Sequence, residues 1–466
     1  FKTNKMKTKI YSLLLLLLGL LPESIFAQTT YNYTDTDGNV WTYTVDGSGN
    51  AHIINLNTSG ANFTTDGSHI IFHGDELRIP STVSNGTNIY TVTEIINPLL
   101  PSGFIAEKVV LPSSIKQVFG WTFFHTWVRR FVAEPGSQID LGYMAFAINC
   151  NDYSDPMDAD LYYDFSECPF NSSFSGVLAF GPTNDNALFF TNAASDQVFS
   201  EHRKPSIFAN TDNVVRAGIC ASLHIDDEES FESPRTFTAT QAKYERVFSN
   251  VAGKAVSTLY LPYPTDLPNG MRAYTLIRKG FDENGDKAFC FAPVPAGTRL
   301  EAYKPYLVQI TDGASHTLPT MHNVTVPATP DIESTAVMAN ADSDWKFYGT
   351  TLRIKNDKAY AKKAYYLNGN KWWAVQNGVT NDYIAPFRCF ISSPTGAVPA
   401  KSFFMVLDEE DNNTTGIKSL ENKINEDIKS GKYPFYSVDG KLMGNDYNAL
   451  ESGQIYIVNG KKFYKI

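Results

Sequence analysis

VVLPSSIKQVFGWTFF at residues 109–124 and FVAEPGSQIDLGYMAF at residues 131–146 are two versions of one pattern. Three pairs of residues align 22 positions apart: Gly120 with Gly142, Trp121 with Tyr143, and Phe124 with Phe146. A period in the twenties is typical of solenoids, in which neighbouring units stack because none can bury its apolar face alone. Solenoids normally need three or more units and only two align well here, so chance similarity in an aromatic-rich chain is the alternative.

The details of these units point to a family. Leu111–Ile115 reads Leu-Pro-Ser-Ser-Ile, and Gly142 comes shortly before Ala145-Phe146. Together with the flanking strands, residues 76–146 resemble the BspA-type leucine-rich repeat. The resemblance implies curved, stacked strands at a bacterial surface, and members of that family are mostly linked to adhesion. The departures from the family pattern are Phe119, Phe123 and Pro98.

The rest of the chain also favours strands. Asn-Gly and Asp-Gly pairs such as Asp37-Gly38 and Asn459-Gly460 recur throughout, and they tolerate the positive φ of tight hairpin turns. Alternating runs such as Trp41–Val45 lie between them, as in strands with one buried face. Residues 257–274 with 293–309, and residues 364–393, resemble β-sandwich-like modules that accompany such repeats in Bacteroidetes exported proteins.

We therefore predict a mainly β fold, with a short degenerate leucine-rich-repeat solenoid, β-sandwich-like modules and a C-terminal β-hairpin tail. The predicted segments are a signal peptide (1–27), an N-terminal β-hairpin region (28–75), the repeat region (76–210), a β-sandwich-like module (211–330), a second β module (331–411), a linker (412–432) and a tail (433–466).

Both ends carry export signals. Four Lys precede the apolar run Leu13–Leu21, and small residues up to Ala27 follow, as in a signal peptide cut near that residue. The run is shorter than the roughly 20 residues of a membrane span, so we expect no transmembrane span in the mature chain. Residues 433–466 resemble the C-terminal sorting tail of type IX secretion substrates, with Gln454 interrupting the usual Gly-Ile junction; a plain closing hairpin is the alternative. We expect a secreted or outer-membrane surface location.

Composition narrows the function. The formal net charge is −10, which disfavours nucleic-acid binding. The chain has five Cys, namely Cys150, Cys168, Cys220, Cys290 and Cys389, and no Cys-x-x-Cys. Cys150–Cys168 is the first choice for a disulfide, because these two are nearest in sequence; the remaining pairing stays open.

No known catalytic motif is present. The sequence has no Gly-x-Ser-x-Gly elbow, His-Glu-x-x-His helix, Walker loop or dinucleotide fingerprint. His69 and His73 would lie roughly 13 Å apart on one strand face, too far for one metal ion. The acidic runs 226–229 and 408–411 contain oxygens that suit Ca²⁺, but solvated charge is the common reading. We predict no cofactor, no metal and no catalytic residue.

Four tryptophans are the candidate ligand contacts: Trp121, Trp127, Trp372 and Trp373. Adjacent strand residues point to opposite faces, so one of the pair Trp372-Trp373 should face outward. Exposed aromatic rings offer a flat surface to sugars or partner proteins. We predict a non-enzymatic surface binding or adhesion protein whose partner is a host protein or glycan. The alternatives are a secreted glycan- or peptide-acting hydrolase and a structural surface component.

Overall fold

The computed structural model describes most of the chain. The described residues are 29–67, 69–96, 98–142, 145–147, 160–168, 180–181, 184–191, 213–249, 255–282, 285–339, 344–369, 371–379, 383–393, 401–407, 431, 433–458 and 461–465. Strands dominate this part, as predicted, and its one α-helix is the short α3 (Asn356–Ala361). The predicted signal peptide lies outside the described residues.

The N-terminal region is an antiparallel meander. Its strands are β1 (Thr30–Thr34), β2 (Val40–Val45) and β3 (Asn50–Asn57). The predicted alternation along β2 is confirmed, because Trp41 and Tyr43 are fully buried while Thr42 between them is half-buried. At the first turn the Asp35 carboxylate accepts the backbone N–H of Asp37 and Asn39 at 3.0 and 2.9 Å, and Gly38 has φ of 84°. This is the aspartate-supported turn that the Asp-Gly signal predicts.

A stack of mainly parallel strands follows, and successive passes of the chain add strands to three sheets. One sheet contains β6 (Leu77–Arg78), β10 (Val109–Leu111), β13 (Arg130–Ala133), β16 (Tyr162–Phe165), β18 (Leu188–Thr191) and β19 (Val214–Arg216). A second contains β7 (Thr82–Ser84), β8 (Ile89–Ile95), β11 (Gln117–Val118) and β14 (Asp140–Leu141), with β3 beside β8. The third contains β4 (Phe63–Asp66), β5 (His69–Phe72), β9 (Phe104–Ala106) and β12 (Trp127–Val128). A separate parallel pair is β15 (Phe146–Ala147) with β17 (Phe180–Gly181).

The register confirms the 22-residue offset. Val109 of β10 pairs with Phe131 of β13, and Ile105 of β9 pairs with Trp127 of β12, each 22 positions later. Gly142 lies directly against the Gly120 backbone. Phe123, Phe131, Phe146 and Tyr163 pack together inside the stack with ring centroids about 5 Å to 6 Å apart, so aromatic rings do much of the filling that smaller apolar residues do in other repeats.

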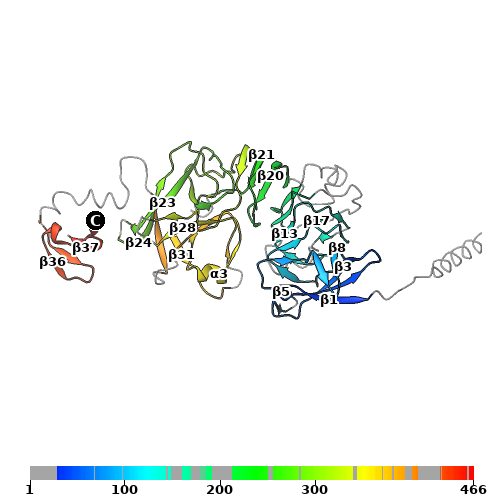
Figure 1. Cartoon of the computed structure of the whole chain (residues 1–466). Coiled ribbons are helices and arrows are strands. Elements are labelled where there is room, and N and C mark those ends of the chain that lie inside the picture. The colour runs from blue at the N-terminus through cyan, green and yellow to red at the C-terminus, as the bar shows by residue number, and fades with distance from the viewer. Residues whose placement is uncertain are drawn as a thin grey trace, which may run out of the picture.

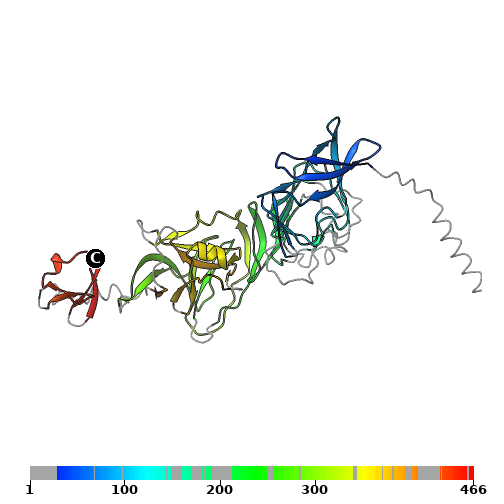
Figure 2. The same cartoon turned by 90° about the horizontal axis from the view of Figure 1, so that it is seen from below.

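The first of these sheets continues beyond the stack. It gains β20 (Ile219–Asp226), β21 (Phe237–Glu245) and β26 (Met321–Val326), giving nine strands. Both views place these green strands between the blue-to-cyan stack and the rest of the molecule (Figures 1 and 2). The predicted boundary between residues 210 and 211 is therefore not a sheet boundary. The physical reason is that a free edge strand offers unpaired backbone groups, and β20 and β21 cover the edge left by β19.

The two predicted sandwich modules share one ten-stranded sheet. Its strands, in spatial order, are β22 (Val256–Leu259), β25 (Tyr306–Ile310), β23 (Met271–Phe281), β24 (Lys287–Pro293), β34 (Ser402–Leu407), β31 (Lys371–Ala374), β30 (Tyr365–Asn368), β33 (Arg388–Ser392), β28 (Lys346–Thr350) and β27 (Val337–Met338). A small pair, β29 (Ile354–Lys355) with β32 (Tyr383–Ile384), lies beside α3. Because β24 pairs with β34, strands from both sides of the predicted boundary at 330 meet in one sheet.

The tail forms its own small sheet. Its strands are β35 (Phe435–Ser437), β36 (Leu442–Gly444), β37 (Gln454–Val458) and β38 (Lys461–Lys465), with a 3-10 turn at Tyr447–Ala449. Gly440, with φ of 86°, lies in the β35–β36 turn, and β37 pairs with β38 in antiparallel fashion, so both predicted hairpins are confirmed. Phe435 is fully buried in a core confined to the tail.

Candidate functional site

The turn that follows β11 presents an aromatic surface on the stack. We call it the aromatic ledge and define it by Trp121, Phe124 and His125. Trp121 is 48% exposed. Its ring stacks on Phe124 with centroids 5.7 Å apart, and Phe124 stacks on His125 at 3.9 Å. The three rings therefore form a continuous stacked series that ends in an exposed tryptophan.

The same turn is fixed from beneath. The Thr122 and Thr126 hydroxyls are buried and donate hydrogen bonds to the carbonyls of Phe119 and Phe123, at 2.7 and 2.8 Å. The Phe123 ring is 1% exposed and stacks on a ring of the next unit. Thr122, Phe123 and Thr126 are thus buried within the same turn, and their contacts hold the ledge in place.

The backbone of the ledge is strained. Trp121 and His125 have φ of 63° and 59°, in the left-handed region that bulky residues avoid. Such a residue costs about 1–3 kcal/mol and persists only where the surrounding structure imposes it. Because Trp121 is 48% exposed, burial of the indole does not by itself account for this strain, which is the reason to consider the residue functional.

Trp127 and His69 lie on the third sheet, and His73 follows β5 of that sheet directly. Trp127 is half-buried on β12, and its ring centroid lies 4.4 Å from that of His69 on β5. His73 instead shares a 2.7 Å hydrogen bond with Thr64. The two histidines therefore have different partners, and no group of three or more His, Cys, Asp or Glu suited to a metal occurs among the described residues.

The tryptophan pair on β31 includes one predicted ligand contact, Trp372, that the structure does not bear out. Trp372 is fully buried between Phe291 and Phe347, with ring centroids 6.0 and 5.8 Å away, so it cannot contact a ligand at the surface. Its neighbour Trp373 is half-buried. Adjacent residues of a strand point to opposite faces, and Trp372 is the one that points into the core of the ten-stranded sheet.

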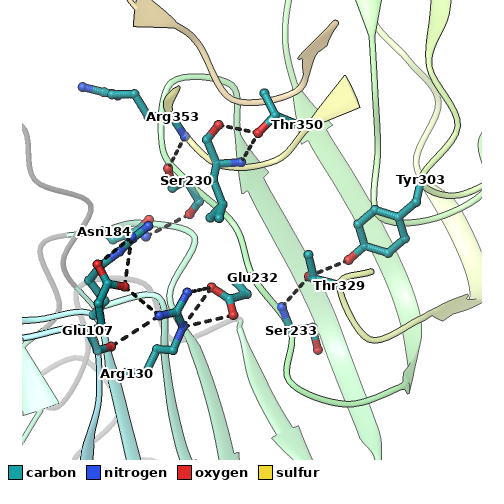
Figure 3. Close-up of polar contacts among 12 residues, drawn as sticks. Glu107, Arg130, Asn184, Ser230, Glu232, Ser233, Tyr303, Thr329, Thr350 and Arg353 are labelled. Carbon is teal, nitrogen blue, oxygen red and sulfur yellow. Dashed lines mark hydrogen bonds and ion pairs between the residues drawn. The ribbon is translucent and has the colours of Figure 1, made fainter. Parts of the chain in front are cut away.

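A connector, residues 227–236 between β20 and β21, joins the stack to the ten-stranded sheet. Figure 3 shows Arg130 of β13 between Glu107 and Glu232, with N···O distances of 2.9 and 2.7 Å. The next residue of the connector, Ser233, donates its backbone N–H to Thr329, and the hydroxyls of Thr329 and Tyr303 share a 2.9 Å hydrogen bond. The connector therefore bonds to both parts of the chain.

Removal of the Arg130 guanidinium should weaken the junction between the stack and the connector. Arg130→Ala is expected to lower the free energy of unfolding by about 1–3 kcal/mol, because the Glu232 carboxylate stays largely buried without its main partner. Lys108→Ala removes one of the two cations that pair with Glu76, at a side chain that is more exposed (31%) than Arg130 (18%), and should cost less than about 1 kcal/mol. Urea denaturation of the two variants checks this. Equal stability losses would contradict the role given to Arg130.

Three cavities bear on the hydrolase alternative. Their volumes are about 440, 520 and 710 Å³. Their linings contain no carboxylate, Glu107 alone and Asp266 alone, respectively. None of these three cavities therefore presents the two carboxylates that glycoside hydrolysis requires.

Carboxylates of the acidic run 226–229 make hydrogen bonds within the protein. Asp227 accepts two hydrogen bonds from the Arg388 guanidinium, each 2.6 Å long, and the N–H of Glu228 bonds to the Asp226 carboxylate. The Asp227 oxygens are therefore taken, and a calcium site there is not supported. The other acidic run, 408–411, lies outside the described residues.

The cysteines give no disulfide in the described part of the chain. Cys168 is a buried free thiol, and burial raises its pKa to about 12. Cys150, its expected partner, lies outside the described residues. Cys389 is also buried, and burial raises the pKa of its thiol to about 12, so neither thiol is activated for chemistry.

Comparison with known proteins leaves the family open. No family model and no curated protein matches the chain. One solved structure that matches is a leucine-rich cell surface protein from Faecalibacterium prausnitzii A2-165, at 13% identity and a TM-score of 0.20. The match covers 58% of this chain and 66% of that one, so the chain spans just under two thirds of its length. A TM-score this low carries no argument about fold or function.

In the part of the chain that the structure describes, no helix is long and apolar enough to cross a membrane.

Proposed function

We propose that this chain is an exported, non-enzymatic surface protein that binds a host glycan or protein through the aromatic ledge. The observation that carries the proposal is Trp121, which is half-exposed, stacked on Phe124 and held at positive φ by a turn anchored beneath it. Under this proposal, the stacked strands are a degenerate BspA-type leucine-rich-repeat array that serves as the scaffold of the ledge.

The two ends of the chain support the export part of the proposal. The Lys-rich leader with its apolar run would be removed near Ala27. The tail folds around its own core and carries the two hairpins that type IX sorting tails share, which fits a separate sorting module. Measurement of the N-terminal sequence and the cell fraction of the native protein tests both points.

The chemistry of the ledge favours a ligand with a flat apolar face. An indole ring offers such a face with little conformational entropy to lose, and a sugar ring or an apolar side chain of a partner protein fits it. The stacked Phe124 and His125 rings fix the indole, so binding would need little reorganisation.

The first test is a binding array of glycans and host-matrix proteins, probed with the purified mature chain (residues 28–466). We expect saturable binding to at least one ligand and no turnover of it, as followed by product chromatography. Cleavage of an offered polysaccharide or peptide would overturn the non-enzymatic proposal in favour of a hydrolase. Concentration-dependent self-assembly with no ligand bound would favour a structural component.

Trp121→Gly separates binding from stability. Glycine accepts φ of 63° without strain, so the variant should be as stable as the parent or more stable by up to about 1 kcal/mol. Loss of the indole should nevertheless weaken ligand binding at least about tenfold. Tyr360→Ala removes a comparably exposed aromatic ring, 46% exposed on α3, and should leave binding unchanged. Calorimetric titration with a ligand from the array, together with thermal melts, measures both effects.

A further inference from the structure

A second site lies on the C-terminal part of the molecule, away from the ledge. We call it the arginine pocket. It is a cavity of about 440 Å³ between the chain that leaves β21, strand β22, the β30–β31 hairpin and the start of β33. That volume falls within the roughly 300–1,000 Å³ of small-molecule sites. Arg246 and Arg388 are the charged residues among those that line it.

Arg388 already has a full partner. Its guanidinium donates to both carboxylate oxygens of Asp227, at 2.6 Å each, and the Tyr244 hydroxyl bonds to the same carboxylate. Burial opposes ionisation of Asp227, but the hydrogen bonds from Arg388 and the charges of both arginines outweigh it and hold the Asp227 pKa below its usual value. Asp227 is therefore a fixed anion committed to Arg388.

Arg246 is less well compensated. One of its terminal nitrogens donates to the Thr258 carbonyl at 2.9 Å, and its guanidinium lies 4.4 Å from the Phe248 ring centroid. Its ion pair with Asp227 is longer, at 3.7 Å, and that carboxylate is already held by Arg388. Burial lowers the pKa of Arg246, and the neighbouring charge of Arg388 lowers it further. Among the residues that the structure describes around the pocket, two cations thus share one carboxylate, which leaves an excess of one positive charge.

We propose that the arginine pocket binds a small monocarboxylate, whose carboxylate pairs with Arg246. A buried charge is stable only when it is paired, and a ligand with one negative charge balances the excess in the pocket. The planar guanidinium matches a carboxylate in shape. Ser257, which also lines the pocket, carries a hydroxyl that suits the polar body of a sugar acid or an acylated amino acid.

The test is calorimetric titration of the full chain with sodium glucuronate, N-acetylalanine, glucose and inorganic phosphate. We expect one saturable site for at least one of the two carboxylates and none for glucose, which lacks the charge. At pH 8, where most inorganic phosphate carries two negative charges, phosphate should bind more weakly, because the single excess positive charge leaves one of them unbalanced. No heat from either carboxylate, or phosphate binding that is tighter than both, would overturn the proposal.

Variants locate the site. Arg246→Gln should weaken carboxylate binding at least about tenfold, and Arg246→Lys, which keeps the charge but not the fork, should fall in between. Lys243→Gln removes the same charge from an exposed position on β21 and should bind as the parent does. Equal binding by Arg246→Gln and the parent would contradict the assignment.

Two further readouts keep the result clear. If Arg246→Gln does not fold, modification of the parent by phenylglyoxal replaces it. Whichever carboxylate binds in the titration should slow the reaction at Arg246, as measured by peptide mass. Equal rates with and without that carboxylate would refute the site. Trp121→Gly should leave carboxylate binding unchanged. The experiments can therefore refute ligand binding at the aromatic ledge and carboxylate binding in the arginine pocket independently.

Discussion

Trp372→Ala is expected to lower the free energy of unfolding by about 3–5 kcal/mol, the usual cost of deleting a buried large aromatic side chain. The indole is fully buried against Phe291 and Phe347, and β31 holds it at the centre of the ten-stranded sheet. Few atoms can move into the space, because Phe291 and Phe347 also pack against each other, with ring centroids 5.5 Å apart. Chemical denaturation followed by fluorescence or circular dichroism measures the loss.

Two controls make this result specific. Trp373→Ala, at the half-buried neighbouring position, should cost clearly less. Trp372→Phe should cost about 1 kcal/mol, because it keeps most of the packing and removes an indole N–H that finds no hydrogen-bond partner among the described residues. A larger loss for Trp373→Ala than for Trp372→Ala would mean that the strand presents the opposite face to the core.

Gly142→Ala is expected to destabilise the stack by about 3 kcal/mol or more, at or above the upper end of ordinary overpacking. A Cβ at Gly142 would lie 2.1 Å from the Gly120 nitrogen and 2.6 Å from the Phe119 carbonyl carbon. Backbone atoms cannot turn aside as a side chain does, so the two units would have to separate. Thermal unfolding measures the effect.

Gly47→Ala is the matched control for this substitution. Nothing lies within 4 Å of a Cβ at Gly47, so the variant should stay within about 0.5 kcal/mol of the parent. If Gly142→Ala were equally harmless, the stacking of the two units at a 22-residue offset would be wrong.

The repeat could be predicted because its signal is local and periodic. Residues that pair across neighbouring strands of the stack, such as Val109 and Phe131, are separated by the same 22 positions as the repeat in the sequence. The turns were predictable for a similar reason, since Asp35 and Gly38 act on their immediate neighbours. The sheet that the two predicted modules share was not predictable, because the pairing of β24 with β34 joins segments more than 100 residues apart. No local pattern encodes which distant edges meet.

The candidate site was predicted only in part. Aromatic crowding around Trp121 pointed to the correct turn, but alternation could not say whether Trp372 or Trp373 faces the core. The contribution of His125 was missed, because its positive φ has no marker in the sequence. Arg246 and Arg388 were missed for a different reason. They are 142 positions apart, and only the fold brings both to Asp227.

The most direct test of the central claim is the dissociation constant of the mature chain for its best array ligand, compared between the parent and Trp121→Gly. The account predicts at least about tenfold weaker binding by a variant whose melting temperature is unchanged or higher. Unchanged affinity in a folded Trp121→Gly variant would contradict it, and would place the ligand on another face of the protein.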